Sequence, residues 1–289
     1  TRGCPYRCTF CSNEQMWTTR YVTRDPKLVV DEMESYMATY NVTNFDFQDL
    51  TAIVNRKWAI RFCNEIIDRG LKITWQMPSG TRSEVFDEEV AGLLYKSGCR
   101  ALAFAPESGA PEILEAIKKK VDLEKLVTSA KIAMKHNMKV SCFFVIGFPD
   151  DTPETLRKSL KMIRRLAVIG LWDVAVTKFV PYPGSSLFHE LQKSGKISLD
   201  DDFFHSPMDF YIKDADSYCN AMSSRELYWW MVYMFYNFYL ISFALHPIRT
   251  FRMLIKGIMT GQEETRYVKW FVDRIFTRKR WKKLEKAQL

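Results

Sequence analysis

The hydrophobic positions between residues 26 and 185 repeat with two periods, one typical of helices and one typical of strands. Apolar residues at helical spacing predict helices at 26–40, 55–70, 87–98, 123–137 and 151–170. Alternating or continuous apolar residues predict strands at 43–50, 71–77, 100–108, 139–149 and 172–185. The strand starts recur at roughly 30 to 40 residues, the length of one strand-plus-helix unit. The pattern therefore predicts a series of βα units with parallel strands.

Local signals mark the ends of several predicted helices. Asn55 is a candidate N-cap, and Gly70 is a candidate stop for the same helix. Asp151 and Glu154 have the spacing of a capping box, with Pro153 in the first turn of the helix that follows. These signals place two helix starts near residues 55 and 151.

The strand at 139–149 is almost entirely apolar, as expected for a parallel strand that is covered on both faces. Thr1–Gly3 has the position of the last residues of a sixth strand. The predicted fold class is α/β, a partial parallel (β/α)6 barrel like a TIM barrel, with a helical, aromatic-rich C-terminal extension. Residues 1–199 are the predicted core domain, with its first strand truncated, and residues 200–289 are the extension. The loops after the strands should meet at one mouth.

The segment 227–245 has 19 residues without a charge and is dense in aromatic side chains. It reaches the length at which a membrane span has to be considered. Tyr and Trp rings with polar tips prefer the headgroup region, and Asn237 also disfavours the hydrocarbon core. Three roles stay open for this segment: a helix buried against the barrel, an interfacial helix, and a span.

The positive charge of the chain is concentrated at its C-terminal end. The net charge of the chain is +8, and residues 249–289 carry 12 Lys and Arg against 4 Asp and Glu, which is +8 for that stretch alone. Such a block suits an anionic partner or is a solvated helix that aids solubility. Because the basic residues follow the aromatic segment, they favour peripheral contact with an anionic membrane surface.

Three of the seven cysteines, Cys4, Cys8 and Cys11, lie close together in the sequence. Thiolates at this spacing are typical ligands of iron–sulfur clusters and of zinc. A closed zinc site requires four ligands, and His136 and His189 are distant and lie in helical patterns. A four-iron cluster held by three thiolates keeps one iron open for a substrate or cofactor. A cluster, zinc and a chance occurrence all stay open on the spacing alone.

The other four cysteines lie among apolar neighbours and lack the spacing of a disulfide framework. This distribution indicates buried thiols in a reducing compartment, and we therefore expect a cytoplasmic protein. The four residues are Cys63, Cys99, Cys142 and Cys219.

In its context, the cysteine motif resembles that of the radical S-adenosylmethionine superfamily. The motif opens the βα series, follows "RG" and has Phe10 directly before the last cysteine, and the resemblance extends to about residue 190. It implies that Cys4, Cys8 and Cys11 hold a [4Fe–4S] cluster, whose open iron binds the amino and carboxylate groups of S-adenosylmethionine. It further implies reductive cleavage of that cofactor to a 5′-deoxyadenosyl radical, with an electron donor such as flavodoxin or ferredoxin.

The resemblance also assigns cofactor contacts to residues at the strand ends. The motif "FDFQDLT" stands where the family receives the methionine amino group, "APESG" stands near the ribose and carboxylate, and "FFVIGFP" flanks the adenine. An arginine in "SGTRSE" is a candidate carboxylate clamp or a plain surface residue. The glutamate of "APESG" is alternatively a cap for the helix after Pro111. The residues assigned in this way are Phe10, Gln48, Asp49, Arg82, Glu107, Ser108, Ile146 and Gly147.

Four motifs together resemble the branch of this superfamily that carries an N-terminal cobalamin-binding domain: "RGCPYRCTFCSN", "EILEAIKKK", "VIGFPDDTPET" and "VPYPGSSLF". That branch includes radical methyltransferases and the anaerobic magnesium-protoporphyrin ester cyclase. The resemblance implies methyl transfer or cyclisation on a hydrophobic small molecule, such as a lipid or a tetrapyrrole. The chain starts at Thr1, directly before the cysteines, so we expect the cobalamin domain to precede it in the full-length protein.

Two other functions are consistent with parts of the sequence. An RNA-modifying methylthiotransferase would hold phosphates with the basic tail. Such enzymes usually end in a β-rich module, whereas this tail is aromatic and helical, so nucleic acid is not the expected partner. The protein could also be non-enzymatic, with zinc or a cluster that only stabilises a loop. That function would not explain the polar motifs at the strand ends.

Overall fold

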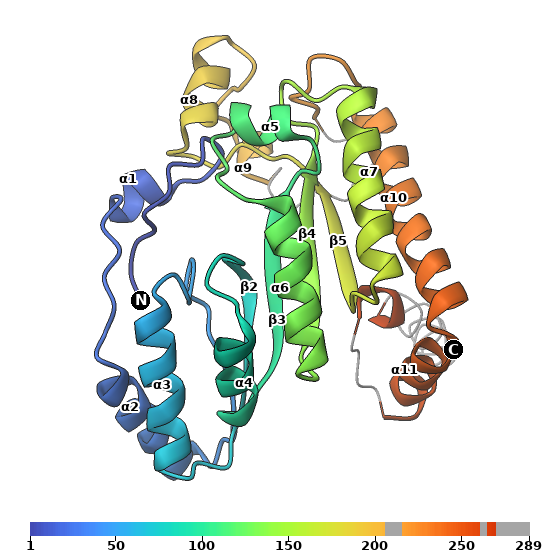
Figure 1. The fold of residues 1–289 in the computed structure, drawn as a ribbon. Helices are drawn as coiled ribbons and strands as arrows, with labels where there is room; N and C mark the ends of the chain where they lie inside the picture. The colour runs from blue at the N-terminus through green and yellow to red at the C-terminus, as the bar shows by residue number, and fades with distance from the viewer. Residues whose placement is uncertain (206–215, 261–264, 270–289) are drawn as a thin grey trace, which may run out of the picture.

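The computed structural model describes residues 1–205, 216–260 and 265–269, and a parallel five-stranded sheet forms its centre (Figure 1). Every neighbouring pair of strands is parallel, which confirms the α/β class. The strands lie across the sheet in chain order: β1 (Asn44–Asp46), β2 (Thr74–Thr81), β3 (Cys99–Glu107), β4 (Lys139–Ile146) and β5 (Asp173–Lys178).

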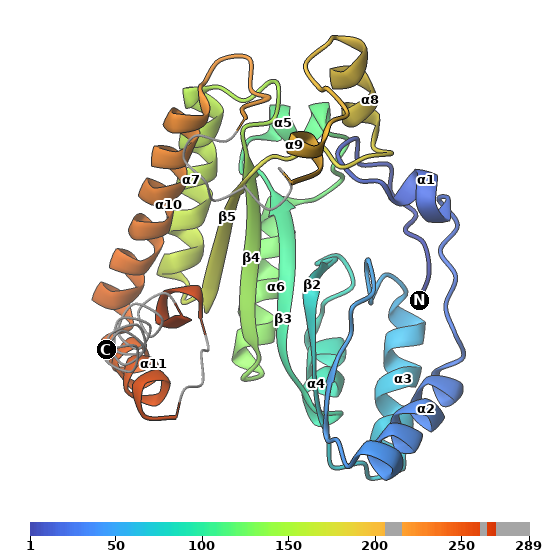
Figure 2. The same ribbon diagram turned by 180° about the vertical axis from the view of Figure 1, so that it is seen from behind.

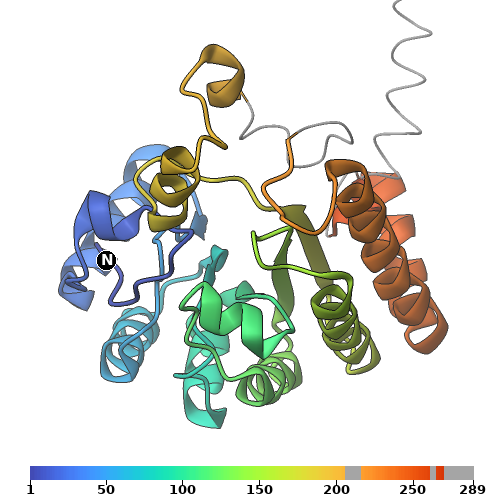
Figure 3. The same ribbon diagram turned by 90° about the horizontal axis from the view of Figure 1, so that it is seen from above.

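Helices alternate with the strands and cover the outer face of the sheet (Figure 3). Seven of them belong to the first part of the chain: α1 (Asn13–Trp17), α2 (Pro26–Tyr40), α3 (Arg56–Asp68), α4 (Glu88–Lys96), α5 (Pro111–Ala116), α6 (Leu123–Lys135) and α7 (Pro153–Val168). The remaining helices of the described residues are α8 (Ser186–Lys193), α9 (Asp201–His205), α10 (Ser224–Leu245) and α11 (Pro247–Thr260). The five helices predicted in the core are α2, α3, α4, α6 and α7.

The strands separate a tightly packed outer face from a concave inner face. In β4, Val140, Cys142 and Phe144 are buried beneath the helices, whereas Ser141 and Phe143 are half-buried on the other side. Figure 2 shows this inner face, where no described helix lies across the middle of β2 to β5. The nearly continuous apolar sequence of β4 therefore serves one closely packed face and one partly open face.

Most of the core lies between the sheet and the outer helices. Trp75 of β2 is fully buried, and its ring meets Phe62 of α3 edge to face at 5.4 Å between centroids. Phe62 in turn stacks on Trp58, at 5.2 Å and an interplanar angle of 9°. Burial of each such ring contributes about 1.5–3 kcal/mol, so this aromatic layer holds the sheet and its helices in one body.

The start of α7 differs from the predicted capping box by one residue. The N-cap is Thr152, whose side chain accepts from the Thr155 amide, while the Thr155 hydroxyl accepts from the Thr152 amide. Asp151 is occupied elsewhere, because its carboxylate accepts the amides of Gly147 and Phe148 at 2.8 and 3.0 Å. The helix therefore takes the next hydroxyl as its cap, and Pro153 is in its first turn as predicted.

Thr1–Gly3 does not extend the sheet. Arg2 instead forms an isolated antiparallel bridge with Val22, with both amide-to-carbonyl distances at 2.9 Å. Both hydrogen bonds of the Arg2 backbone are therefore made with Val22 and not with a strand of the sheet. Within the described residues the sheet has five strands, with β1 and β5 at its edges.

Helix α10 packs on the outside of α7 and against β5 (Figures 1 and 3). Its buried side chains include Leu227, Met231, Met234 and Phe238, which join the main core. One face of the charge-free segment is therefore buried against α7 and β5, which corresponds to the buried helix among the three roles considered above.

In the described residues no single helix has the length and apolar character to cross a membrane. Helices α10 and α11 meet that test only as a pair, and their axes are bent by 111° at the break between them. The most basic part of the tail, "RKRWKK" at residues 278–283, lies outside the described residues. The predicted domain boundary at residue 199 stays a prediction.

Candidate cluster and cofactor site

The loop that carries the three cysteines lies at the carboxyl ends of the strands, beside α5 and α8 (Figures 1 and 3). The amide of Thr9 donates to the carbonyl of Ile117 at 3.0 Å, and the carbonyl of Thr9 accepts the amide of Leu187 at 2.9 Å. The Ser12 hydroxyl also donates to the carbonyl of Pro183 at 2.8 Å. The loop is therefore fastened to segments that lie more than a hundred residues away in the sequence.

Cys4, Cys8 and Cys11 are all partly exposed on this loop. A tight turn joins the last two, because the Cys11 amide donates to the Cys8 carbonyl at 3.1 Å. Burial raises the pKa of the Cys8 and Cys4 thiols, and the positive charges of Lys119 and Arg82 oppose that shift at both. Metal ligation requires thiolates, so the two cations favour the ligand form of these cysteines.

The kind and number of the donors fit an iron–sulfur cluster better than a single ion. No group of three His, Cys, Asp or Glu side chains in the described part of the chain is arranged to hold one metal ion. A zinc site requires its ligands about 2.0–2.3 Å from a common point. A cluster instead takes each thiolate on a different iron, and three thiols on one loop supply such a set.

Glu107 ends β3 beside the cysteine loop in a left-handed backbone conformation, with φ at +68°. Its buried carboxylate accepts from the Lys119 ammonium at 2.8 Å. The same ammonium lies 5.8 Å from the centroid of the Phe10 ring. Glu107, Lys119 and Phe10 therefore form one contiguous group next to Cys8.

Lys119 is a site residue that the sequence pattern does not single out. It lies in the run "KKK" at 118–120, which enters the sequence argument only as part of a branch motif. The side chains of Lys118 and Lys120 do not share its position, since both residues are exposed while Lys119 is 11% exposed. The residue type alone does not show which of the three lysines is buried.

Phe10 connects the cysteine loop to the ends of β4 and β5. Its ring centroid lies 5.6 Å from that of Phe148, and Phe148 lies 5.0 Å from Phe179. Ile146 is completely buried just before this point, and Gly147 follows with φ at +87°. The assigned residues Phe10, Ile146 and Gly147 are thereby brought to one side of the mouth.

Gly147 is in close contact with the first turn of α10. A Cβ at this position would lie 2.6 Å from Leu227 Cδ1, closer than atoms approach in proteins. Asp151 fixes the adjoining turn through the two backbone amides described above, and the Thr155 hydroxyl donates to its other oxygen at 2.7 Å. The motif assigned to the adenine is therefore also the docking point of the C-terminal helix.

Arg82 is buried between the cysteine loop and the connection from α5 to α6. Its guanidinium lies 3.9 Å from the centroid of the Tyr6 ring and donates to the Glu84 carboxylate at 2.7 Å and to the Lys120 carbonyl. The plain surface reading is thus wrong for this residue. The carboxylate that it binds in the structure is that of Glu84, and a clamp on a ligand stays a prediction.

Gln48 and Asp49 follow β1 on the other side of the cysteine loop. Gln48 is exposed and accepts from the Ser79 hydroxyl at 2.8 Å. The Asp49 carboxylate accepts from the Thr1 hydroxyl. Ser108, in contrast, is buried, with its oxygen 3.2 Å from that of Ser159 and accepting the Ala110 amide at 3.1 Å. These bonds shape the turn after β3.

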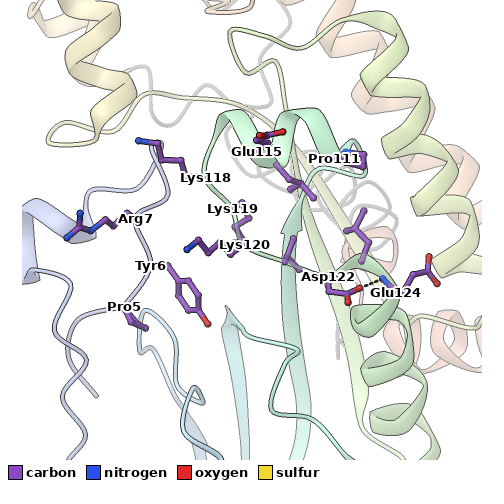
Figure 4. Close-up of a pocket in the computed structure, with 13 residues that line it drawn as sticks. Pro5, Tyr6, Arg7, Pro111, Glu115, Lys118, Lys119, Lys120, Asp122 and Glu124 are labelled. Carbon is purple, nitrogen blue, oxygen red and sulfur yellow. Dashed lines mark hydrogen bonds between the residues drawn. The ribbon is translucent and has the colours of Figure 1, made fainter.

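A cavity of about 880 Å³ lies between the cysteine loop and the segment that joins α5 to α6 (Figure 4). Pro5, Tyr6 and Arg7 line one side, and the opposite side includes Lys118 and Lys120. Its wall combines cationic, acidic and apolar side chains. The cavity opens beside the loop that carries Cys4 and Cys8, and not over the concave face of the sheet.

The model of the family "Radical SAM superfamily" matches residues 1–163, which is more than half of the chain. The chain belongs to the radical SAM superfamily. The cofactors of this superfamily are a [4Fe–4S] cluster and S-adenosylmethionine, as expected from the cysteine motif. The residues that contact them in this radical SAM chain stay predictions.

Two curated relatives resemble the radical SAM part. "Uncharacterized methyltransferase PH0819" of Pyrococcus horikoshii is 32% identical over 191 residues, which are 65% of this chain and 40% of the relative. The anaerobic magnesium-protoporphyrin IX monomethyl ester cyclase of Rubrivivax gelatinosus is 31% identical over 193 residues, which are 66% of this chain and 34% of the relative. The chain thus spans about a third to two fifths of the length of these relatives.

A solved structure shares the fold. The radical S-adenosylmethionine methyltransferase TsrM of Kitasatospora setae, with cobalamin and a [4Fe–4S] cluster bound, superposes with a TM-score of 0.58 at 24% identity. The match covers 66% of this chain and 38% of the TsrM chain. The expected superfamily is thus confirmed, and the relatives that this chain resembles include methyltransferases and a cyclase.

Proposed function

We propose that this chain is the radical SAM part of a cobalamin-dependent enzyme that transfers a methyl group to a hydrophobic substrate or closes a ring on it. The observation that carries the proposal is the three-cysteine loop, held at the strand ends beside the buried pair of Glu107 and Lys119. The relatives named above are methyltransferases and a cyclase, which supports the reaction class.

In this proposal Cys4, Cys8 and Cys11 hold the [4Fe–4S] cluster. When bound, the cluster and S-adenosylmethionine supply a one-electron cleavage that yields a 5′-deoxyadenosyl radical. Lys119 and Arg82 place positive charge near the thiolates and offset part of their negative charge. The backbone bonds of the loop to α5 and α8 hold the three thiols in position before any metal binds.

Aromatic rings close one side of the proposed site against water. Phe10, Phe148 and Phe179 form a continuous row from the cysteine loop to the end of β5. Exclusion of water protects a radical from side reactions. The left-handed backbone conformation at Glu107 directs its carboxylate toward Lys119. We assign Glu107 to cofactor binding at this end of β3.

In this proposal the concave face of the sheet receives a bulky substrate. Small residues lie on that side: Ala101 is half-buried, and a Cβ at Gly80 would lie 3.2 Å from the Cβ of Ala105 and 3.9 Å from the Phe143 ring. The Arg266 guanidinium lies 5.2 Å from the centroid of the Phe143 ring, and the small side chains leave part of this face apolar. This surface suits a lipid or a flat tetrapyrrole-like molecule.

Cobalamin would be bound by a part of the full-length protein outside this chain. TsrM has cobalamin bound, and its chain is more than twice as long as the matched region. The protein would act in the cytoplasm with a small electron donor such as flavodoxin or ferredoxin. RNA is a less suitable substrate, since residues 200–205 and 216–260 contain helices and no strand of a β-rich RNA-binding module.

The cluster is tested by anaerobic reconstitution of the full-length protein with iron and sulfide. We expect about four irons per chain and broad absorbance at visible wavelengths. Incubation with S-adenosylmethionine and a reductant should then release 5′-deoxyadenosine. Stoichiometric zinc without iron uptake would reject the cluster, and with it the radical chemistry.

Two cysteine variants, one in the loop and one in the core, provide a matched test of the cluster ligands. Cys8→Ala should lower the iron content and abolish release of 5′-deoxyadenosine, because one ligand of the cluster is lost. Cys142→Ala should change neither by more than about twofold, because that thiol is completely buried in the core beneath the outer helices. If Cys8→Ala keeps full iron and cleavage, the assignment of the loop is wrong.

A further inference from the structure

Helix α11 has a stripe of exposed apolar side chains along one face. Five of its side chains are well exposed: Ile248 (75%), Phe251 (66%), Ile255 (41%), Ile258 (43%) and Met259 (79%). Their spacings of mostly three or four positions place them within one sector of the helix, since each residue turns it by roughly 100°. Scattered exposed apolar residues are ordinary, but an ordered stripe of five marks an interaction site.

The opposite face of α11 is the one that packs on the protein. Thr250, Met253 and Gly257 are buried there. Met253 packs with Val268 and with the half-buried Trp172, which precedes β5. The helix is thus fixed in one rotation about its axis, and that rotation leaves the apolar stripe outward.

Basic residues flank the stripe, and the helix contains no acidic residue. Arg252 and Lys256 are exposed on the side of the stripe next to Ile255 and Met259. Arg249 is the exception, because it donates to the Gly170 and Leu171 carbonyls and belongs to the packed side. An apolar face bordered by cations is typical of helices that lie in the headgroup region of a bilayer.

Helix α10 adds exposed aromatic side chains on the outer side of the molecule. Trp229 is 56% exposed and Tyr236 46% exposed, and Leu240 is exposed between them and the end of the helix. Figures 1 and 3 show α10 and α11 as the outermost elements on this side, away from the cysteine loop. Aromatic rings with polar atoms are enriched at the boundary of the bilayer.

We propose that α11 binds parallel to the surface of an anionic lipid bilayer, with its apolar stripe between the headgroups and Arg252 and Lys256 at the lipid phosphates. The charge complementarity favours this occupant over a second copy of the chain, which would bring two sets of cations together. The continuing sequence supports it as well, since residues 249–289 carry a net charge of +8. The proposal is independent of the chemistry at the cysteine loop.

Vesicle cosedimentation of the purified full-length protein tests the proposal. Vesicles of equal parts phosphatidylglycerol and phosphatidylcholine should bind the protein at low salt, and binding should weaken as salt rises. Pure phosphatidylcholine vesicles should bind it more weakly. A full-length protein that stays in the supernatant with the anionic vesicles overturns the proposal.

Three variants locate the contact on α11. The double variant Phe251→Ser with Ile255→Ser should lower the partition coefficient by roughly tenfold or more, from the loss of two inserted side chains. Arg252→Gln should lower it about fivefold on anionic vesicles and leave it unchanged on phosphatidylcholine. The matched control is Leu28→Ser, a 57% exposed leucine on α2 at the other side of the molecule, which should have no effect.

Two results would contradict the assignment even if the protein binds vesicles. Equal losses in the control and in the double variant would mean that binding is not specific to α11. A self-association measured by sedimentation velocity without lipid, and abolished by the double variant, would identify a second copy as the occupant. Thermal unfolding of each variant shows whether it is folded. If the double variant does not fold, Arg252→Gln still tests the proposal, because its side chain is exposed.

Discussion

The buried pair of Glu107 and Lys119 shows how much the site depends on single side chains. Glu107 holds a backbone conformation that costs about 1–3 kcal/mol for a residue other than glycine. The Glu107 and Lys119 side chains are both nearly inaccessible to water, with exposed fractions of 9% and 11%. Each charge therefore requires the other, and removal of one leaves the other without compensation.

Replacement of Lys119 by methionine should lower the free energy of unfolding by about 2–4 kcal/mol, since the Glu107 carboxylate would be left buried and unpaired. Urea unfolding monitored by circular dichroism measures this loss. Lys118→Met is the matched control, because Lys118 is the preceding residue and is exposed. It should change the free energy by less than about 0.5 kcal/mol. Equal effects in the two variants would contradict the role of the pair.

The sequence alone does not distinguish these two lysines. Lys118, Lys119 and Lys120 are identical in type, and the sequence offers no periodicity after α5 ends at Ala116. Which one turns inward depends on the path of the chain beyond Ile117, whose carbonyl is bonded to the cysteine loop. The cysteines themselves could be found, because their spacing is set by the ligand chemistry and not by tertiary packing.

The elements were more predictable than the contacts between them. The helix predicted at 26–40 is α2, residue for residue, since its apolar positions and its Pro26 start are both local signals. The strand predicted at 43–50 is shorter in the structure, because β1 is an edge strand that pairs only with β2 over three residues. The capping of α7 was misplaced because Asp151 bonds to a turn that the helical pattern does not reveal.

The contact between α10 and the end of β4 gives a prediction at this scale. Gly147→Ala should cost about 2–4 kcal/mol, because φ is positive and the new Cβ would overlap Leu227. Gly195→Ala is the matched control, since Gly195 also has a positive φ but a Cβ there would have no atom of the described residues within 4 Å. It should cost only about 1 kcal/mol. Chemical denaturation of both variants measures the difference.

Combining Gly147→Ala with Leu227→Ala separates the two causes. If the overlap with Leu227 is responsible, the double variant should lose less stability than the sum of the two single variants. Additive losses would show that the backbone conformation alone accounts for the cost, and that α10 does not press on this turn.

At the scale of the whole molecule, the cysteine loop fastens remote segments to one another. Through Thr9 and Ser12 it reaches the end of α5, the start of α8 and the loop after β5. None of these bonds has a signal in the sequence, because backbone atoms make most of them. A group bound by Cys4, Cys8 and Cys11 should therefore stabilise more than the loop itself.

Removal of iron from the reconstituted protein by a chelator should lower the melting temperature by about 5 °C or more, since a ligand that binds only the folded state stabilises it. Anaerobic calorimetry of the two forms measures the shift. The Cys8→Ala protein should have the same melting temperature with and without iron reconstitution. An unchanged melting temperature in the unaltered protein would show that the cluster contributes nothing to the fold.

Leu227 contacts Gly147 but lies outside the stretch that matches the family model, which ends at residue 163. The rim of the mouth is thus shaped in part by a helix outside that stretch. Substitutions in the first turn of that helix would tilt the rim and alter which molecules enter. Such substitutions would change the entrance and leave the cysteine loop unaltered.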